Sequence, residues 1–164
     1  MLPSDIMLDA KFAALMIESY QRIVGRSLAD EGAGEGAGEG AGERATAQYL
    51  YHDAPFCLLA HNRDEDPRFI YANVTAQKRF GYGWDEFTNL HSCLSAEEPN
   101  RTERQRLLEA VKRQGFIGDY CGVRIAKSGQ RFWIDHVVVW ELIDEVGVRH
   151  GQAAMFRNWR DLTG

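Results

Sequence analysis

A histidine, two serines and a cysteine stand together in the segment LHSCLSAEE, residues 90–98. A thiol can attack a substrate or link to a cofactor, and a histidine can ligate haem. Ser92 and Ser95 lack the G-x-S-x-G setting that exposes a nucleophilic serine. No lysine or arginine lies close to Cys93 in the sequence to favour its thiolate. We therefore expect Cys93 to be a small half-buried residue, without a catalytic set around it.

The other metal-ligating residue types are scattered. The histidines are His52, His61, His91, His136 and His150. No two of them have the HxH or HxxxH spacing of a metal site. The three cysteines form no CxxC pair, and an odd number does not make a disulfide framework. We expect no metal site, and free thiols fit a reducing cytoplasm.

Composition limits the class of protein. The chain has 164 residues, of which 45% are apolar and 26% charged, as expected of one globular domain with an appendage. The formal net charge of −5 lacks the basic footprint of a nucleic-acid binder. No segment approaches the ~18 consecutive apolar residues that span a bilayer. We therefore expect neither nucleic acid nor a membrane as a partner.

The chain divides at a low-complexity block. Residues 31–43 read EGAGEGAGEGAGE, and such a glycine-rich segment cannot repay the entropy lost on ordering. We predict a flexible linker over residues 30–44 and an amphipathic helix within residues 1–29, ended by Gly25. Its apolar stripe consists of Leu8, Phe12, Leu15, Met16, Ser19, Tyr20 and Ile23. This helix must dock in cis on its own domain or in trans on a second chain, and the sequence leaves both open.

The remaining residues, 45–162, form the predicted main domain. Five runs have the apolar pattern of strands: 56–61, 68–73, 119–126, 131–144 and 151–159. A short helix capped by Asn73 follows the second run, and residues 100–115 form the clearest helix, with Asn100 as its cap. The order predicts an α+β fold, with a five-stranded antiparallel sheet and short helices on one face.

These residues also resemble a known family. The segment FIYANVTAQKRFGYGWDEF is similar to the opening of a PAS domain. With LSAEEPNRTERQRLLEAVKRQGFIGDYCGVRIAKSGQRFWIDHVVVWELID, it resembles the MEKHLA family, a PAS-related group. The resemblance runs from about Phe12 to Trp159, apart from the glycine-rich block. It implies a PAS-like fold and a regulatory or sensing role, and no catalytic set. Without a homeodomain or a zipper, DNA binding does not carry over.

A light-oxygen-voltage domain is a PAS relative that holds flavin next to a reactive cysteine. Cys93 resembles that cysteine in position, but Leu94 stands where the family has an arginine for the flavin phosphate. Ile134 stands where the family carries an asparagine. Some PAS domains hold haem through a histidine in the region of His91. A flavin or haem photosensor or redox sensor is therefore the alternative, and we expect no cofactor.

Aromatic residues are dense enough to line the hollow of a PAS-like fold. Strict alternation in residues 131–144 would place Phe132, His136 and Trp140 on one face. Either side chains fill the hollow, or it forms an apolar pocket with a few polar groups. The candidate ligand pocket consists of Tyr71, Asn73, Phe80, Trp84, Arg124, Phe132, His136, Trp140 and Gln152. The sequence thus predicts a non-enzymatic sensory or regulatory module that binds a small apolar ligand or a downstream signalling protein and forms a homodimer.

Overall fold

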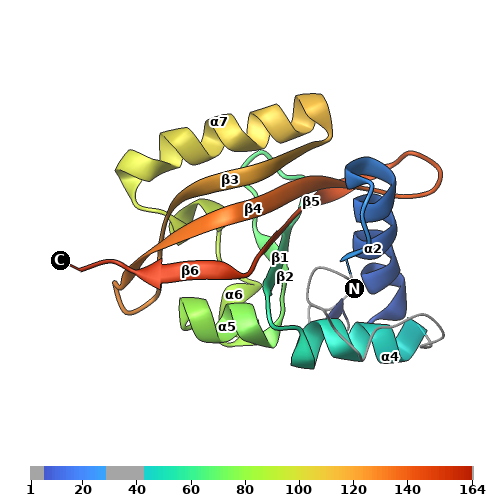
Figure 1. The fold of residues 1–164 in the computed structure, drawn as a ribbon, viewed down its shortest axis with the longest axis horizontal. Coiled ribbons are helices and arrows are strands. Elements are labelled where there is room, and N and C mark those ends of the chain that lie inside the picture. Colours follow the sequence, from blue (N-terminus) through green and yellow to red (C-terminus); the bar gives the residue numbers. More distant parts are fainter. Residues whose placement is uncertain (1–5, 29–42, 164) are drawn as a thin grey trace.

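The protein is α+β, built on one antiparallel sheet, as predicted (Figure 1). The computed structural model describes residues 6–28 and 43–163, so most of the predicted linker lies outside the described residues. The strand order is β2-β1-β5-β4-β3, and β6 pairs with β4 as a sixth strand. The strands are β1 (Cys57–His61), β2 (Phe69–Ala72), β3 (Phe116–Ile125), β4 (Arg131–Ile143), β5 (Arg149–Phe156) and β6 (Asn158–Asp161).

The sheet has an inner face, covered by the short helices and by α7. The inner-face elements are α5 (Val74–Phe80), α6 (Trp84–Phe87), the 3-10 turn η2 (Ser92–Ser95) and α7 (Glu98–Gln114). Asn73 caps α5 as predicted, because its side chain accepts a hydrogen bond from the Ala76 N–H at 3.0 Å. The prediction that Asn100 caps α7 is wrong, since α7 begins at Glu98, just before Pro99.

Helix α2 (Ala10–Val24) covers the opposite, outer face, and in this single-chain structure it docks in cis. It begins after Asp9, whose carboxylate accepts from the Lys11 N–H at 3.1 Å, and ends at Gly25 with φ 85°. Its Tyr20 packs edge-on against Trp140 of β4, with ring centroids 4.8 Å apart. The Ser19 hydroxyl donates to the Ile143 carbonyl at 2.8 Å, joining the helix to the end of the same strand.

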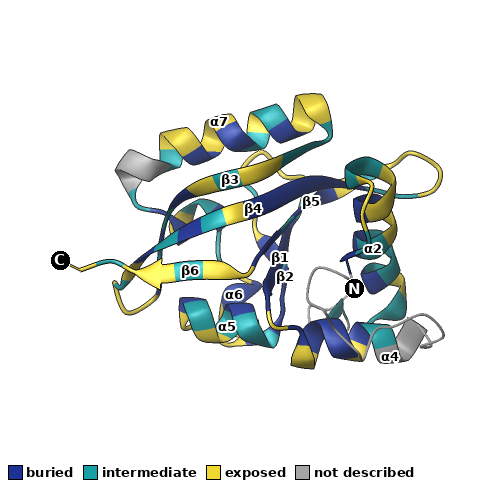
Figure 2. Ribbon diagram, viewed as in Figure 1, coloured by how far each residue is buried: buried dark blue, intermediate teal, exposed yellow. Residues whose placement is uncertain are grey.

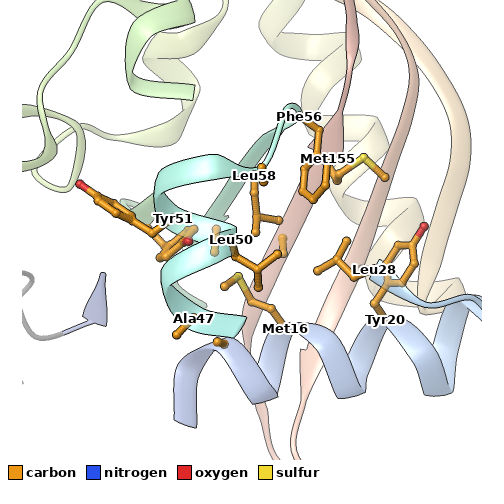
Figure 3. Packing of buried hydrophobic residues seen from close by; sticks show 14 of the residues in the cluster. Met16, Tyr20, Leu28, Ala47, Leu50, Tyr51, Phe56, Leu58 and Met155 are labelled. Carbon is orange, nitrogen blue, oxygen red and sulfur yellow. The ribbon is translucent and has the colours of Figure 1, made fainter. Parts of the chain in front are cut away.

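A helical segment that the sequence did not predict joins the linker to β1. It consists of α4 (Glu43–Gln48) and the π-helical turn η1 (Tyr49–Asp53). Leu50 and Tyr51 of η1 are buried and belong to the same outer-face cluster as Met16 of α2 (Figure 3). The segment therefore completes the cover over the outer face.

The core consists of two clusters on the two faces of the sheet. The outer cluster includes Met16, Tyr20, Leu50, Leu58, Tyr71, Trp84, Val138, Trp140, Leu142 and Met155. The inner cluster includes Cys57, Leu59, Phe69, Phe80, Phe87, Leu107, Val111, Phe132, Ile134, Val137, Val139 and Phe156. Burial runs along β4 and β5, whereas the side of α7 that faces away from the sheet is exposed (Figure 2). Within residues 6–28 and 43–163, none of the helices combines the length and hydrophobicity needed to cross a bilayer.

A bulge in β4 overturns the predicted face assignment. His136 has φ 52°. Ile134 pairs with Gly122 of β3, and Val137 pairs with Tyr120, so β4 has one more residue than β3 between these two pairs. An extra residue reverses the alternation that follows it. Side chains before the bulge, such as Phe132, therefore lie on the inner face, whereas Trp140 lies on the outer face. His136 itself is exposed.

Candidate ligand cavity on the inner face

The inner cluster encloses a cavity of about 60 Å³ between α7, β3 and the centre of the sheet. Its walls are mostly apolar, formed by Leu59, Ala60, Phe69, Phe80, Leu107, Leu108, Ile134, Val137, Val139, Ala153, Ala154 and Phe156. Six polar residues also line it: His61, Ser95, Arg104, Tyr120, Arg124 and Gln152. A single water molecule needs roughly 10–15 Å³ of such cavity volume, so the cavity has room for a small molecule. It is far smaller than the ~300 Å³ or more of pockets for drug-sized ligands.

Arg104 brings a buried positive charge to the cavity from α7. Its side chain lies on the buried stripe of the helix, three residues before Leu107, and only 6% of the residue is exposed. One guanidinium nitrogen donates to the Ser92 hydroxyl at 2.7 Å. Burial lowers the pKa of Arg104 to about 10, and the positive charge of Arg124 contributes to that shift. The two guanidinium groups therefore act on one another.

Arg124 brings the second positive charge, from β3. The residue is 7% exposed, and it donates to the Val123 carbonyl at 2.8 Å and to the Tyr120 hydroxyl at 3.3 Å. Gly122 leaves room for this arrangement, since a Cβ there would lie 2.5 Å from the Tyr120 hydroxyl oxygen and 3.4 Å from Nη1 of Arg124. In the described residues, neither Arg104 nor Arg124 forms an ion pair.

His61 and Gln152 bring hydrogen-bond acceptors to the cavity. The two residues are paired in register on β1 and β5. His61 Nδ1 donates to the Asn62 carbonyl at 2.9 Å, which leaves Nε2 as an acceptor. Gln152 Nε2 donates to the Leu108 carbonyl at 3.1 Å, which leaves Oε1 as an acceptor. Both Nε2 of His61 and Oε1 of Gln152 are buried without a hydrogen-bond partner among the described residues.

The environment of His61 keeps its ring neutral. Burial lowers the pKa of His61 from its usual 6.5 to about 4, and the positive charges of Arg104 and Arg149 act in the same direction, whereas the Asn62 carbonyl and the neighbouring Gln152 side chain oppose the shift. An open groove of about 450 Å³ lies outside this point, between the β1–β2 connection and α7. The groove and the cavity share His61, Leu108 and Gln152 as lining residues. These three side chains therefore stand between the cavity and solvent.

The structure divides the nine pocket residues expected from the sequence. Phe80, Arg124 and Gln152 line the cavity, and Phe132 packs against Phe80 in the inner cluster with ring centroids 5.1 Å apart. Tyr71 and Trp140 belong instead to the outer cluster, on the other side of the sheet, and Trp84 of α6 packs edge-on against Tyr71 of that cluster. His136 is exposed on the bulge, where its Nδ1 lies 2.7 Å from the Asp119 carboxylate.

Asn73 does not line the cavity, because its side chain is used in structural hydrogen bonds. It accepts from the N–H groups of Ala76 and Leu58 and donates to the carbonyls of Leu50 and Phe56. The sequence reading missed Arg104, because a charged residue on a polar helix suggests a solvated face. Its spacing of three and seven residues before Leu107 and Val111 is the signal that places it on the buried face.

The residues present do not fit a flavin or a haem. Neither Cys93 nor His91 is among the lining residues of the cavity. His91 Nδ1 lies 3.1 Å from the Asp66 carboxylate, at the edge of the fold. A flavin ring system exceeds a cavity of about 60 Å³ whose walls include Phe69 and Phe80. Within the described parts of the chain, no group of three or more histidine, cysteine, aspartate or glutamate side chains is placed to hold a metal ion.

Solved structures with this architecture are PAS domains. The PAS domain of a protein from Colwellia psychrerythraea matches with a TM-score of 0.55 at 14% sequence identity, covering 66% of this chain and 87% of that chain. A PAS domain from a two-component sensor histidine kinase matches with a TM-score of 0.54 at 15% identity, covering 71% and 93%. The light-state dimer of the fungal blue-light photoreceptor Vivid matches with a TM-score of 0.51 at 18% identity, covering 63% and 77%. At these identities the likeness establishes a PAS-like fold.

The sequence itself gives the family. Residues 10–161 match the MEKHLA domain, so the chain belongs to the MEKHLA domain family. This confirms the resemblance seen in the sequence. No curated protein matches the chain.

Proposed function

We propose that this protein is a non-enzymatic sensory module that binds a small molecule in the inner-face cavity. The observation that carries the proposal is an apolar cavity lined by two buried acceptors without hydrogen-bond partners, Nε2 of His61 and Oε1 of Gln152, and by two buried arginines without an ion pair among the described residues. Ligand sites are typically apolar with a few polar groups that fix orientation. A buried polar group without a partner costs about 1–3 kcal/mol, so a ligand that pairs with these groups gains affinity.

A binding role is favoured over catalysis by how the hydroxyls near the cavity are used. The Ser95 hydroxyl donates to the Ser92 carbonyl at 2.8 Å, and the Ser92 hydroxyl accepts from Arg104 at 2.7 Å. Neither serine is therefore paired with a general base, as a nucleophile would require. Neither Cys93 nor His91 lines the cavity.

Strand β4 offers a physical route from the cavity to the rest of the molecule. Val137 and Val139 line the cavity, whereas Val138 and Trp140, which alternate with them, belong to the outer cluster beneath α2. A ligand that shifts β4 therefore acts on the contact between Trp140 and Tyr20 of α2. Through this coupling the occupied state would be read by a second copy or by a downstream signalling protein.

The proposed homodimer uses a surface other than the outer face, which α2 covers. The turn between β4 and β5 carries Val146 and Val148, which are 79% and 45% exposed. It lies next to α2, because Arg22 donates to the Ile143 carbonyl where β4 ends. Light scattering coupled to size exclusion tests the dimer: Val146→Asp is expected to shift the wild-type dimer to a monomer, and a wild type that is monomeric at all concentrations would contradict it.

Amide chemical shifts of the full-length chain test the ligand site directly. We expect that fragments of a few non-hydrogen atoms, screened as mixtures, will perturb the amides of α7, β3 and β5 around the cavity. Amides of α5, which lies outside the cavity lining apart from Phe80, serve as the internal control. Perturbations confined to exposed loops, or none with any fragment, would overturn the proposed function.

A further inference from the structure

We propose that the ligand of the cavity is a small organic acid that also carries a hydroxyl group, and this rests on the ligand-binding function proposed above. The carboxylate binds between Arg104 and Arg124. The hydroxyl donates to one of the two buried acceptors, Nε2 of His61 or Oε1 of Gln152. The class is therefore that of short hydroxy acids.

The requirement for an anion follows from the two buried guanidinium groups. A buried charge is costly unless it is paired and hydrogen-bonded. Arg104 uses one donor on Ser92, and Arg124 uses its donors on a neighbouring carbonyl and on Tyr120, so neither finds a negative partner in the described residues. Arginine presents a planar fork of donors that matches a carboxylate. A carboxylate would pair with both groups and lower their summed charge from +2 to +1.

The acidic side chains nearest this site are used elsewhere. Asp66 is close enough to raise the pKa of Arg104, but it is exposed and lies against His91 at 3.1 Å. Glu103 is exposed, near the Tyr120 hydroxyl. Glu141 is buried on β4, where it pairs with Arg149 at 2.8 Å. The positive charge on the cavity wall is therefore left for a ligand.

The hydroxyl follows from the two buried acceptors on the cavity wall. Nε2 of His61 and Oε1 of Gln152 are buried, and both can only accept a hydrogen bond in this arrangement. An ammonium group would also donate, but Arg104 and Arg149 already make this part of the wall positive enough to disfavour a charged His61. A neutral hydroxyl meets the acceptors without that repulsion.

The size of the ligand follows from the cavity. A volume of about 60 Å³ corresponds to about four to six non-hydrogen atoms at roughly 10–15 Å³ for each water-sized position. Leu59, Phe69 and Val137 provide apolar walls for a short hydrocarbon segment. Lactate has a carboxylate, a hydroxyl and one methyl group, and it is therefore the probe of choice.

Three matched compounds separate the parts of the proposal in calorimetric and amide-shift titrations of the full-length chain. Lactate is expected to bind and to shift the amides around Arg104 and Gln152. Lactamide, which keeps the shape and loses the charge, is expected to bind at least about tenfold more weakly. Propionate lacks the hydroxyl, and its binding is expected to be weakened about fivefold.

Substitutions of two arginines on α7 provide a second, independent test. Arg104→Gln is expected to weaken lactate binding at least about tenfold. The control Arg106→Gln removes the same charge from an exposed position of α7, and it is expected to change lactate affinity by less than about twofold. Arg104→Lys keeps the charge and loses the fork, so its affinity lies between those of the wild type and Arg104→Gln. Circular dichroism establishes that each variant is folded, and the compound series on the wild type needs no variant.

The outcomes separate this inference from the proposed function. If lactamide or another neutral fragment shifts the cavity amides as strongly as lactate, the acid is wrong and the ligand site stands. If Arg106→Gln weakens lactate binding as much as Arg104→Gln, the anion binds by surface charge, and the inference is overturned. If lactate does not bind while other fragments do, the class of ligand is wrong; if no fragment perturbs the cavity, both proposals fail.

Discussion

Arg104 of α7 and Arg124 of β3 line one cavity from two different elements, and neither guanidinium has a carboxylate partner in the described chain. Folding alone does not favour such a pair, because burial and mutual repulsion both oppose the charged forms. Burial, with a contribution from the charge of Arg124, lowers the pKa of Arg104 to about 10. We infer that the two arginines lie buried at the cavity because they bind an anionic ligand.

The first prediction concerns the stability of the unliganded protein. Arg104→Met removes a buried charge and its repulsion with Arg124, at the loss of one hydrogen bond to Ser92. We expect the free energy of unfolding in urea to stay within about 1 kcal/mol of wild type, or to rise. Leu107→Ala, on the same face of α7, should cost about 2–4 kcal/mol. A loss of 3 kcal/mol or more for Arg104→Met would show that the guanidinium has a structural partner.

Much of the fold could be predicted from the sequence, and the limits have physical causes. Apolar alternation and the Asn73 cap are local signals, so the strands and α5 were predicted. The bulge at His136 leaves no such signal, because a left-handed φ at a non-glycine residue is set by pairing with β3. That single residue moved Trp140 to the outer face.

The candidate site was predicted only in part, for a related reason. Arg124 and Gln152 lie on strands, and they were candidates because they are polar residues within apolar runs. Arg104 and His61 were missed, since charged and polar residue types are assigned to solvent unless a three-dimensional neighbour is known. The cavity joins residues from eight separate helices and strands, and a single sequence contains no signal that these residues lie together in the fold.

The second prediction uses His61 and pH. The folded state holds its pKa at about 4, below the usual 6.5, so between pH 4 and 6.5 the unfolded state binds more protons. The contribution of neutral His61 to the free energy of unfolding is therefore fully present above pH 6.5. It is lost as pH is lowered through this range, by about 3 kcal/mol in total. Urea unfolding at pH 7 and pH 4 measures the loss.

His61→Gln is the control for this measurement, because it removes the titrating ring. Carboxylates whose pKa is lowered in the folded state, such as Asp144, contribute equally in both proteins. The loss between pH 7 and pH 4 should therefore be about 3 kcal/mol larger in the wild type than in the variant. Equal pH dependence in the two proteins would show that His61 is not buried in the neutral form.

The third prediction concerns the docking of α2 on the outer face. Tyr20 is fully buried against Trp140, so Tyr20→Ala leaves a large cavity and is expected to lower the free energy of unfolding by about 3–5 kcal/mol. The matched change Glu18→Ala, at an exposed position of the same helix, should stay within about 0.5 kcal/mol. A Tyr20→Ala effect below 1 kcal/mol would mean that α2 is not part of the folded core.

The fourth prediction separates the structural role of Asn73 from a ligand role. Asn73→Ala removes four buried hydrogen bonds that join η1, β1 and α5, and should cost about 3 kcal/mol or more. Asn73→Asp keeps the Oδ1 acceptor of both accepted hydrogen bonds but sets a carboxylate against the Leu50 and Phe56 carbonyls. Its stability relative to wild type is therefore expected to improve as pH falls and the carboxyl group is protonated, since it can then donate.

Asn73 also provides a test against its earlier assignment to the ligand pocket. Because its side chain is occupied by backbone groups, folded Asn73→Asp at low pH should bind lactate with the affinity of wild type measured at the same pH. A selective loss of binding in that variant would place Asn73 in the site.

The most direct test of the account is a high-resolution crystal structure of the full-length chain with lactate. The account predicts density for one lactate in the inner-face cavity, with its carboxylate within hydrogen-bond distance of Arg104 and Arg124 and its hydroxyl on His61 or Gln152. A cavity that contains only ordered water, or one closed by Phe80 or Tyr120 at lactate concentrations that saturate in solution, would contradict it.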